Sequence, residues 1–366
     1  MGDVSVNGLI GDQREIQVER ALAELRSGRP VLLNAGPLRY LVTAAETADD
    51  KALCAFMSVG VSEAQLVLSE PRLRTLGSSF ETAGIIPLKG LSAANVHDLI
   101  VNVGARLNGH APRVASEIDE AALDLARLAY LLPAAIVAQI PSETSGLGAI
   151  AQVDADALVH YREHVINTPR IVSRAPVPLE EIGETEFVVF RGGEGMRDQV
   201  AVIIGHPDPD EPVYARMHSA CLTGDLFASL KCDCGDQLRG SARFMADNGG
   251  GVILYLDQEG RGNGIANKIR AYGLQHAGYS TYDADEILGF GLDQRGFDFA
   301  AAMLKQLGYS SIKLMTNNPV KVEALKSSGL DIVSSHRARA RLNLHNVAYL
   351  TAKRDRAGHL IEDKLD

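Results

Sequence analysis

The sequence lacks an uninterrupted apolar run long enough to cross a membrane, although 46% of its residues are hydrophobic. Its first residues also lack the positively charged start and apolar stretch of a secretory signal, so we expect a cytoplasmic protein with no membrane partner. Basic residues are the minority, with 36 Lys and Arg against 46 Asp and Glu. The resulting net charge of −10 argues against a protein that coats nucleic acid, but it allows a local basic pocket for a small phosphorylated ligand.

Cysteine is also scarce, and disulfides are rare in the cytosol. Three of the 4 cysteines, Cys221, Cys232 and Cys234, lie close together in the sequence. Three thiolates suit a zinc ion, and a site with three protein ligands leaves a fourth position open for catalysis. The spacing alone leaves two alternatives: a structural zinc site completed by His218, or buried thiols that bind no metal.

The length of 366 residues exceeds the size at which one core usually stops growing, so we expect two domains. Apolar periodicity predicts α/β structure in both halves, and the proline-rich segment 176–178 indicates an extended connector, so we place the boundary near residue 170. The predicted helices are 16–26, 121–132, 154–164, 267–275, 299–307 and 320–327, and the predicted strands are 31–33, 134–140, 200–204, 252–256 and 312–315. The predicted fold class is α/β (α+β), with a mixed sheet and packed helices in each domain.

Two segments carry the chemistry of a ligand site. Residues 216–221 place an arginine, an imidazole and a hydroxyl beside the first thiol. Residues 257–264 form a glycine-rich turn after an apolar strand, where backbone N–H groups and Arg261 suit phosphate oxygens. A glycine-rich turn after a strand is often merely a turn, so this segment alone is weak evidence.

Four motifs together resemble GTP cyclohydrolase II. They are residues 216–237, the turn at 259–261, the sequence NKIRAY at 267–272 and the sequence TNNP at 316–319. The resemblance covers roughly residues 180–362 and includes the order and spacing of the motifs. It implies that Cys221, Cys232 and Cys234 hold one catalytic zinc ion per chain. Water would then attack C8 of the guanine ring of GTP, with loss of formate.

The resemblance assigns further residues. It makes Asp293 a general base and Arg295 a nucleophile toward the α-phosphate in the release of pyrophosphate. Because a guanidinium stays protonated, stabilisation of transition-state charge is an equally good role for Arg295. Magnesium is expected to arrive with the triphosphate. The positions matched to substrate binding are Arg216, His218, Ser219, Gln237, Glu259, Arg261, Tyr272, Thr281, Thr316 and Lys321.

The implied product is 2,5-diamino-6-ribosylamino-4(3H)-pyrimidinone 5′-phosphate, which enters riboflavin biosynthesis, and a homodimer is expected. Three positions depart from the family pattern: Ala220 replaces an acid, Asn263 replaces an apolar residue, and Gly296 stands where an acid is frequent. These departures keep two alternatives open. One is a paralogue that retains the formyl group or uses another nucleotide, and the other is a noncatalytic nucleotide-binding regulator.

The N-terminal half resembles 3,4-dihydroxy-2-butanone 4-phosphate synthase over short segments, 19–33, 41–46 and 123–140. That enzyme needs an acid-rich loop after its first strand, whereas residues 34–40 contain no Asp or Glu. Ile118 and Gln139 stand where a catalytic histidine and glutamate belong, and neither transfers a proton at neutral pH. We therefore expect a degenerate, noncatalytic domain in residues 1–170 and a zinc hydrolase domain in residues 171–366.

Overall fold

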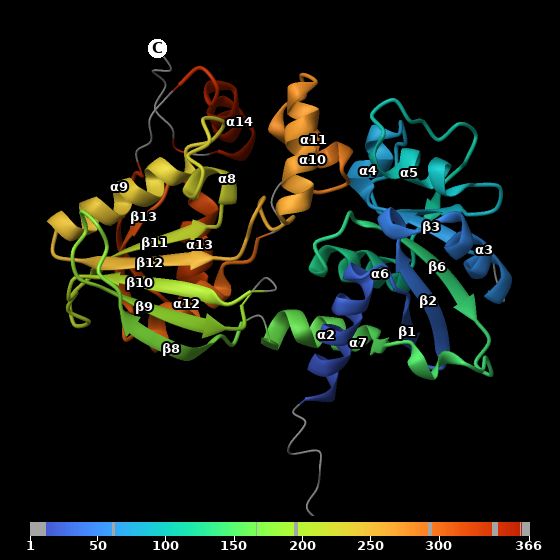
Figure 1. Ribbon diagram of the computed structural model, residues 1–366, viewed down its shortest axis with the longest axis horizontal. Helices are drawn as coiled ribbons and strands as arrows, with labels where there is room; N and C mark the ends of the chain where they lie inside the picture. The colour runs from blue at the N-terminus through green and yellow to red at the C-terminus, as the bar shows by residue number, and fades with distance from the viewer. Residues whose placement is uncertain are drawn as a thin grey trace, which may run out of the picture. The chain divides into compact units, whose positions relative to one another are not determined.

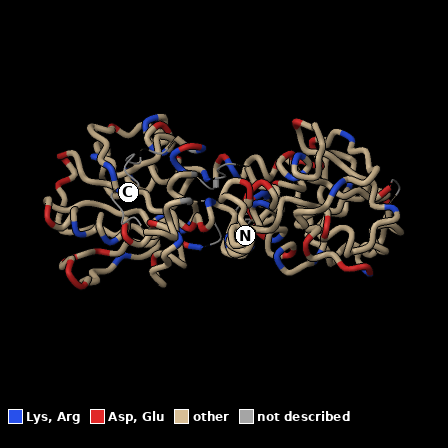
Figure 2. The backbone as a smooth tube through the Cα atoms, turned by 90° about the horizontal axis from the view of Figure 1, so that it is seen from above, with Lys and Arg blue, Asp and Glu red and all other residues tan. Residues whose placement is uncertain are grey.

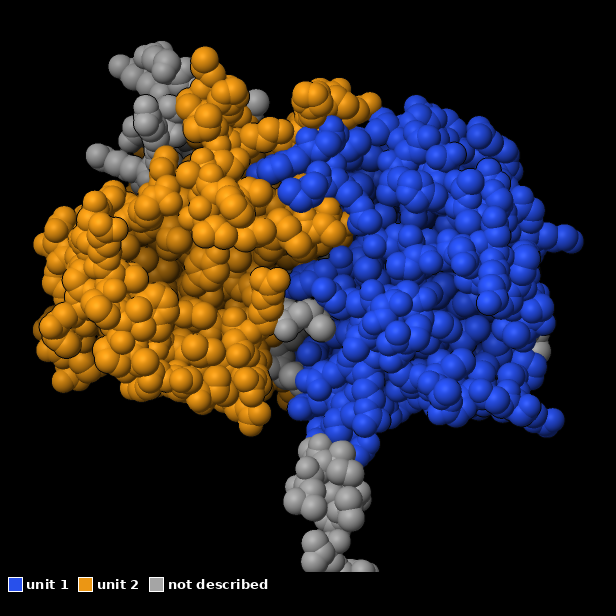
Figure 3. Space-filling view, in the orientation of Figure 1, with its two compact units in different colours: residues 1–163, 269–274, 283–292 blue, residues 164–268, 275–282, 293–366 orange. Residues whose placement is uncertain are grey.

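A computed structural model describes residues 12–60, 63–165, 167–193, 197–291, 295–338, 343–358 and Leu360. The chain divides into two compact units, each containing a seven-stranded sheet (Figures 1 and 3). The first unit comprises residues 1–163, 269–274 and 283–292, and the second comprises residues 164–268, 275–282 and 293–366. Two short segments of the C-terminal half therefore belong to the first unit. Within the described ranges, no helix has the length and apolar character needed to cross a membrane.

The sheet of the first unit has the order β5-β4-β3-β6-β2-β1-β7. Its pairs are antiparallel except for the parallel pair β1/β7. The strands are β1 (Val31–Ala35), β2 (Leu38–Ala44), β3 (Gln65–Leu68), β4 (Gly84–Pro87), β5 (Arg113–Val114), β6 (Ala134–Ile140) and β7 (Gln152–Asp154). The helices are α2 (Gln13–Arg26), α3 (Asp50–Val59), α4 (Glu70–Thr75), α5 (Ala93–Val101), α6 (Glu117–Leu128) and α7 (Ala155–His160), with a π-helix at Tyr161–Val165 and 3₁₀ turns at Ala45–Thr47 and Leu147–Ala149.

Successive side chains along each strand point to opposite faces of this sheet, and both faces are buried. On β3, Val67 packs with residues of α2, α6 and α7. Leu66 and Leu68 point the other way and pack with residues of α3, α4 and α5. Helices thus cover both faces of the sheet.

The predicted bounds of helix 121–132 are wrong, because local capping sets other limits. The helix begins at Glu117, where the Ser116 N–H and hydroxyl both donate to the Asp119 carboxylate, at 2.8 and 2.7 Å. It ends at Leu128, and Tyr130 adopts a left-handed φ of 59° that a helix cannot continue through. The strand predicted at 134–140 is confirmed as β6.

The sheet of the second unit has the order β14-β13-β11-β12-β10-β9-β8. Strands β11 to β14 pair in parallel with one another, and β8, β9 and β10 continue from β12 as an antiparallel set. The strands are β8 (Arg170–Pro176), β9 (Thr185–Arg191), β10 (Gln199–Ile204), β11 (Val213–Ser219), β12 (Gly251–Leu256), β13 (Ser311–Met315) and β14 (Asp331–His336). The helices are α8 (Leu222–Asp225), α9 (Cys234–Asp247), α10 (Ile265–His276), α11 (Thr281–Ile287), α12 (Asp298–Gln306), α13 (Pro319–Ser327) and α14 (Val347–Ala357).

Helices cover both faces of this second sheet (Figure 1). Ile253 on β12 packs with residues of α9, whereas its neighbour Leu254 packs with residues of α12 and α13. The α/β class and the mixed sheets predicted from the sequence are confirmed. Because β11, β12 and β13 run parallel, the segments that follow Ser219, Leu256 and Met315 leave the sheet at one edge. Acidic and basic residues are interspersed over the backbone of each unit (Figure 2).

Candidate active site

The three predicted thiols converge in the second unit. Cys221 opens α8 directly after β11, and Cys234 is the first residue of α9. The sulfur atoms of Cys221, Cys232 and Cys234 all lie within 4.8 Å of one another, and those of Cys221 and Cys232 are 3.6 Å apart. Four-coordinate zinc with bonds of about 2.3 Å places its sulfur ligands roughly 3.8 Å apart, so this spacing fits the ion.

Two glycines next to the thiols make this convergence possible, because neither has a side chain. A Cβ atom added to Gly224 would lie 2.7 Å from the Cys232 sulfur and 3.0 Å from the Cys221 sulfur. Gly235 is equally constrained, because a Cβ there would collide with the Gly224 carbonyl oxygen. The two glycines let α8 and α9 approach closely enough to bring three thiols together.

The electrostatics of the group favour a thiolate at Cys221. Hydrogen bonds from the Cys232 and Cys234 thiols, together with the Lys268 ammonium, hold the pKa of Cys221 well below its ordinary value. The same interaction with Cys221 raises the pKa of Cys232 to about 11. Since a metal ion binds thiolates, the lowered pKa of Cys221 suits a metal ligand.

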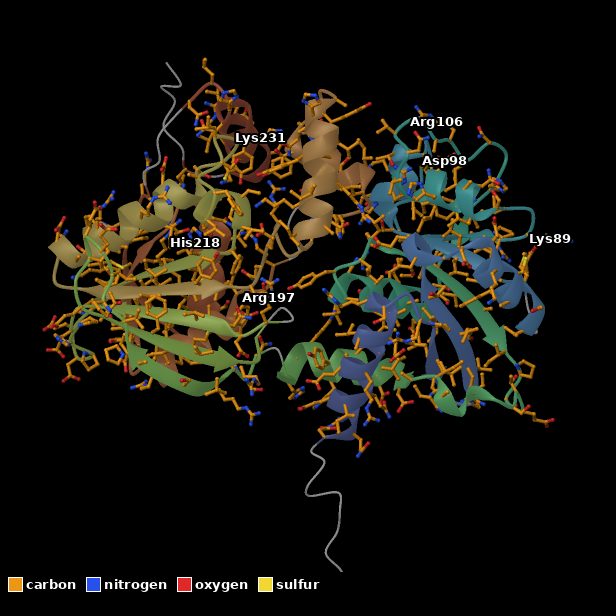
Figure 4. All side chains as sticks on the ribbon, in the orientation of Figure 1. Lys89, Asp98, Arg106, Arg197, His218 and Lys231 are labelled. Atoms are coloured by element: carbon orange, nitrogen blue, oxygen red, sulfur yellow. The ribbon has the colours of Figure 1, made fainter. Side chains whose placement is uncertain are left out.

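His218 does not belong to the thiol group, although the sequence left it open as a fourth ligand. It lies on β11 (Figure 4), where its Nε2 is 3.0 Å from both carboxylate oxygens of Asp225. Its Nδ1 faces Arg216 Nη2 at 3.4 Å. Because arginine only donates and a carboxylate only accepts, these neighbours favour the neutral ring with its proton on Nε2. Burial lowers the pKa of His218 and favours the same neutral form.

Asp225 links several residues of the site, although the sequence pattern did not predict it. Its carboxylate accepts from the Cys221 backbone N–H at 2.9 Å, from the Tyr255 hydroxyl at 3.0 Å and from His218. The His218 ring also stacks on Tyr255, with centroids 5.5 Å apart. Asp225 therefore fixes the backbone at the first thiol and the orientation of His218. Its position four residues after Cys221, one helical turn away, was the available signal.

Arg216 is buried beside the thiols. Its Nη2 donates to Gln237 Oε1 at 2.8 Å, and Gln237 in turn donates to the Asp233 carboxylate at 2.5 Å. Asp233 also accepts from Lys353 at 2.9 Å, a partner on α14 that the sequence reading missed. Burial lowers the pKa of Arg216, and Asp233 counteracts that shift. The Arg216 Nε is buried without a hydrogen-bond partner, which is the state expected of a donor reserved for a ligand.

The glycine-rich turn places Glu259 against the same group. Glu259 Oε1 accepts from Lys268 at 2.6 Å, and Oε2 accepts from the Leu222 backbone N–H at 2.6 Å. Lys268 also lies 3.1 Å from the Cys221 sulfur. Lys268 belongs to the predicted NKIRAY motif, but no role was assigned to it from the sequence.

Two arginines lie near these strand ends. Arg295 Nη1 donates to the Ser219 hydroxyl at 3.1 Å, and Ser219 donates to Gln258 at 3.0 Å. Arg261 has a left-handed φ of 63°, and its guanidinium lies 4.1 Å from the centre of the Tyr282 ring. Asp293, the predicted general base, lies outside the described residues.

The remaining residues predicted to bind substrate lie on several different elements. Lys321 is buried, donates to the Met217 carbonyl at 2.9 Å and so lies against β11. Thr316 is buried after β13, and its hydroxyl accepts from the Asn318 N–H at 3.1 Å. Thr281 begins α11 and accepts from Gln275 at 3.4 Å. Tyr272 lies on α10, in the segment 269–274 that belongs to the first unit.

The three departures from the family pattern leave the thiol group intact. Ala220 continues β11 by donating its N–H to the Leu256 carbonyl at 2.8 Å, and the Gly296 carbonyl accepts from Gln258 at 2.6 Å. Asn263 is buried, and its side-chain oxygen has no hydrogen-bond partner.

In the first unit, the positions matched to the synthase carry no acid–base group. Ile118 is buried in the core between α6 and the sheet, and Gln139 pairs with Tyr40 across β6 and β2. Residues 34–40 close into a tight hairpin, in which Asn34 pairs with Arg39 and Gly36 has a φ of 57°.

Together these features define a site that can bind a metal ion beside an anionic ligand. A model of the family described as GTP cyclohydrolase II matches residues 169–337. The chain is 44% identical over 353 residues to a protein named GTP cyclohydrolase-2 from Xylella fastidiosa (strain Temecula1 / ATCC 700964), covering 95% of this chain and 88% of that protein. The chain therefore belongs to the GTP cyclohydrolase II family, which confirms the resemblance seen in its C-terminal half.

Two further comparisons concern the length and domain organisation of similar proteins. A GTP cyclohydrolase-2 from Shewanella amazonensis (strain ATCC BAA-1098 / SB2B) is 48% identical over 175 residues, which cover 48% of this chain and 85% of that protein. The family thus includes members much shorter than this chain. A crystal structure of a two-domain 3,4-dihydroxy-2-butanone 4-phosphate synthase from A. baumannii matches 88% of this chain and 99% of its own, with 18% identity and a TM-score of 0.34. A likeness at that level decides neither fold nor activity.

Proposed function

We propose that this chain is a zinc-dependent GTP cyclohydrolase II. It hydrolyses GTP to the diaminopyrimidinone ribosyl phosphate, formate and pyrophosphate, and so serves riboflavin biosynthesis in the cytoplasm. The observation that carries the proposal is the juxtaposition, in a member of this family, of three thiols within 4.8 Å and a buried arginine whose Nε has no partner. The thiols fit zinc, and the free donor fits an anionic substrate.

Cys221, Cys232 and Cys234 would hold the zinc ion, because their spacing and thiolate character suit it. Bound zinc supplies Lewis acidity, which makes water a nucleophile near neutral pH. The residues around the thiols supply position: Asp225 holds the Cys221 backbone and Lys268 contacts its sulfur. These contacts favour a fixed site over a flexible one.

Glu259 is the residue that we assign to the guanine edge. A carboxylate offers about four acceptor positions. Oε1 already accepts from Lys268 and the Gly260 N–H, and Oε2 accepts from the Leu222 N–H. One position at Oε2 remains, which suits an N–H donor of guanine.

The cations near the strand ends are assigned to the phosphates. Arg216 has its free Nε, Arg261 projects from the glycine-rich turn, and Lys321 lies against β11. Magnesium bound to the triphosphate would neutralise further charge. Asp293 is the proposed general base. For Arg295 we propose stabilisation of charge at the α-phosphate, because its guanidinium stays protonated and is fixed by Ser219.

We also propose that residues 1–170 are noncatalytic, on the grounds of Ile118, Gln139 and the acid-free hairpin at 34–40. The homodimer is an expectation from the family resemblance.

The test is to incubate the purified full chain with GTP, Mg²⁺ and Zn²⁺ and to identify the products by mass. We expect formate, pyrophosphate and the diaminopyrimidinone phosphate in equal amounts. A product that retains the formyl group, or turnover confined to another nucleotide, would indicate the paralogue instead. Binding of GTP with no turnover would indicate the regulator.

A further inference from the structure

The side chain of Tyr255 contacts two residues of the candidate active site. It lies on β12, where the parallel pairing places it directly beside His218 of β11. Paired residues of adjacent strands point to the same face of a sheet, so the two rings meet. Their centroids are 5.5 Å apart and their planes differ by 17°, which is a stacked arrangement. The Tyr255 ring therefore fixes the plane of the His218 ring.

The Tyr255 hydroxyl fixes a second group, the carboxylate of Asp225. It donates to Asp225 Oδ2 at 3.0 Å. The same carboxylate accepts from the Cys221 backbone N–H at 2.9 Å and lies 3.0 Å from His218 Nε2. The Asp225 side chain is only 7% exposed, and none of these described hydrogen-bond partners is a permanent cation. Its negative charge therefore depends on three donors, and the loss of one would leave a buried oxygen less well satisfied.

The Asp225 carboxylate decides which nitrogen of His218 carries the proton. A carboxylate only accepts hydrogen bonds, so the proton of the neutral ring lies on Nε2. Nδ1 then presents its lone pair to Arg216 Nη2, which is 3.4 Å away. With the opposite tautomer, two donors would face each other in a buried site, because a guanidinium has no acceptor. The state of His218 therefore determines whether Arg216 has an acceptor on this side.

Arg216 is the residue that this network orients. One N–H of its Nη2 is taken by Gln237 Oε1 at 2.8 Å, which leaves the other N–H for His218 Nδ1. A guanidinium is planar and its N–H directions are fixed relative to one another, so two acceptors at Nη2 also set the direction of Nε. The Arg216 Nε is buried without a partner. It can donate to an anion only while the two acceptors hold that direction.

We propose that Tyr255 is a positioning residue for the anion-binding donor of Arg216, and that it acts through Asp225 and His218. All four residues lie in the second unit, in the segment 164–268. The inference rests on the proposed function, which supplies the anion as the triphosphate of GTP. Because Asp225 also holds the Cys221 backbone, one carboxylate serves both a thiol ligand and the phosphate donor.

The test measures the binding of inorganic pyrophosphate to the purified full chain by titration calorimetry, so the readout does not depend on turnover. Tyr255→Phe removes the hydroxyl and keeps the stacked ring. Because groups in one hydrogen-bond network are energetically coupled, we expect the dissociation constant to rise about 3- to 10-fold. Tyr255→Leu also removes the ring from His218 and should weaken binding further. Zinc content should match that of the wild-type chain in both variants.

The matched control is Tyr214→Phe on the adjacent strand β11. It deletes the same hydroxyl group from a ring that packs against Phe244 and His336. The dissociation constant of pyrophosphate should stay within about 2-fold of the wild-type value, because Tyr214 lies outside the network.

A double variant shows whether Tyr255 acts through Arg216. Arg216→Lys keeps the charge and removes the planar group with its Nε donor, so adding Tyr255→Phe to it should change pyrophosphate binding by less than about 2-fold. An undiminished effect of Tyr255→Phe in the Arg216→Lys chain, equal weakening by Tyr214→Phe, or wild-type binding by Tyr255→Phe would overturn the inference. A wild-type chain that binds pyrophosphate but releases no formate from GTP would instead overturn the proposed function.

Discussion

At the scale of single residues, the zinc ligands give the sharpest prediction. Replacing any one of Cys221, Cys232 or Cys234 with serine should abolish both zinc binding and formate release, because two thiolates do not hold the ion in a site that needs three. Metal analysis of each purified variant checks the first effect, and a formate assay checks the second. The exposed Cys54 is the matched control, and Cys54→Ser should keep full zinc content and activity.

Substitutions of Arg295 and Lys321 should distinguish a loss of catalytic rate from a loss of GTP binding. Arg295→Ala should slow pyrophosphate release at least ~100-fold at unchanged zinc content, because one preorganised charge is lost. Arg295→Lys should recover only part of the rate, since it keeps the charge and loses the planar fork. Lys321→Ala should chiefly raise KM for GTP, as expected for a contact made equally in ground and transition states. Steady-state kinetics distinguish these patterns, and near-wild-type release from Arg295→Ala would contradict the assignment.

The site residues that the sequence predicted lie close together along the chain, whereas those that it missed have partners far away in the sequence. Cys221, Cys232 and Cys234 are close in sequence, so their spacing alone indicated a metal site. Lys353 contacts Asp233 across 120 residues, and no local pattern links the two. Long-range partners of this kind depend on the tertiary fold and cannot be read from periodicity.

At the scale of elements, the close approach of α8 and α9 is the feature that builds the thiol site. Gly224→Ala should weaken zinc binding about 10- to 100-fold, because its Cβ would press against two ligand sulfurs. Gly240→Ala lies on α9 with open space around it, so it should keep zinc binding and stabilise the helix by about 0.5–1 kcal/mol. Competition with a chelator measures the zinc affinity of each variant. Equal zinc affinity in the two variants would show that the glycine cradle is unimportant.

The elements also show where sequence patterns fail. Helix α2 and strands β6, β10 and β12 were predicted because their apolar residues follow a clear period. Strand β11 was missed, although it carries Arg216, His218 and Ser219. It is a central parallel strand, buried on both faces, so it lacks alternation, and its buried functional side chains interrupt the apolar run.

At the scale of the whole molecule, the first unit should have no synthase activity. The full chain should produce no dihydroxybutanone phosphate from ribulose 5-phosphate, because Ile118, Gln139 and the hairpin at 34–40 supply no acid–base group. Mass analysis of the products with Mg²⁺ present checks this. Any turnover that survives in a chain with all three site cysteines replaced would assign activity to the first unit.

The sequence predicted two domains in order along the chain, and it gave no sign that residues 269–274 and 283–292 belong to the first unit. The apolar residues of these segments fit an ordinary amphipathic helix equally well. The contact between Ser69 and Gly289 spans 220 residues, so it follows from the tertiary fold alone.

The central claim is that a zinc ion held by the three thiols is required to open the guanine ring. The most direct measurement removes metal from the purified full chain with a chelator, adds zinc back in steps and records formate release from GTP at each step. We expect no formate from the metal-free chain and a linear rise that levels off at one zinc ion per chain. Formate release by metal-free protein, or none at full zinc occupancy, would contradict it.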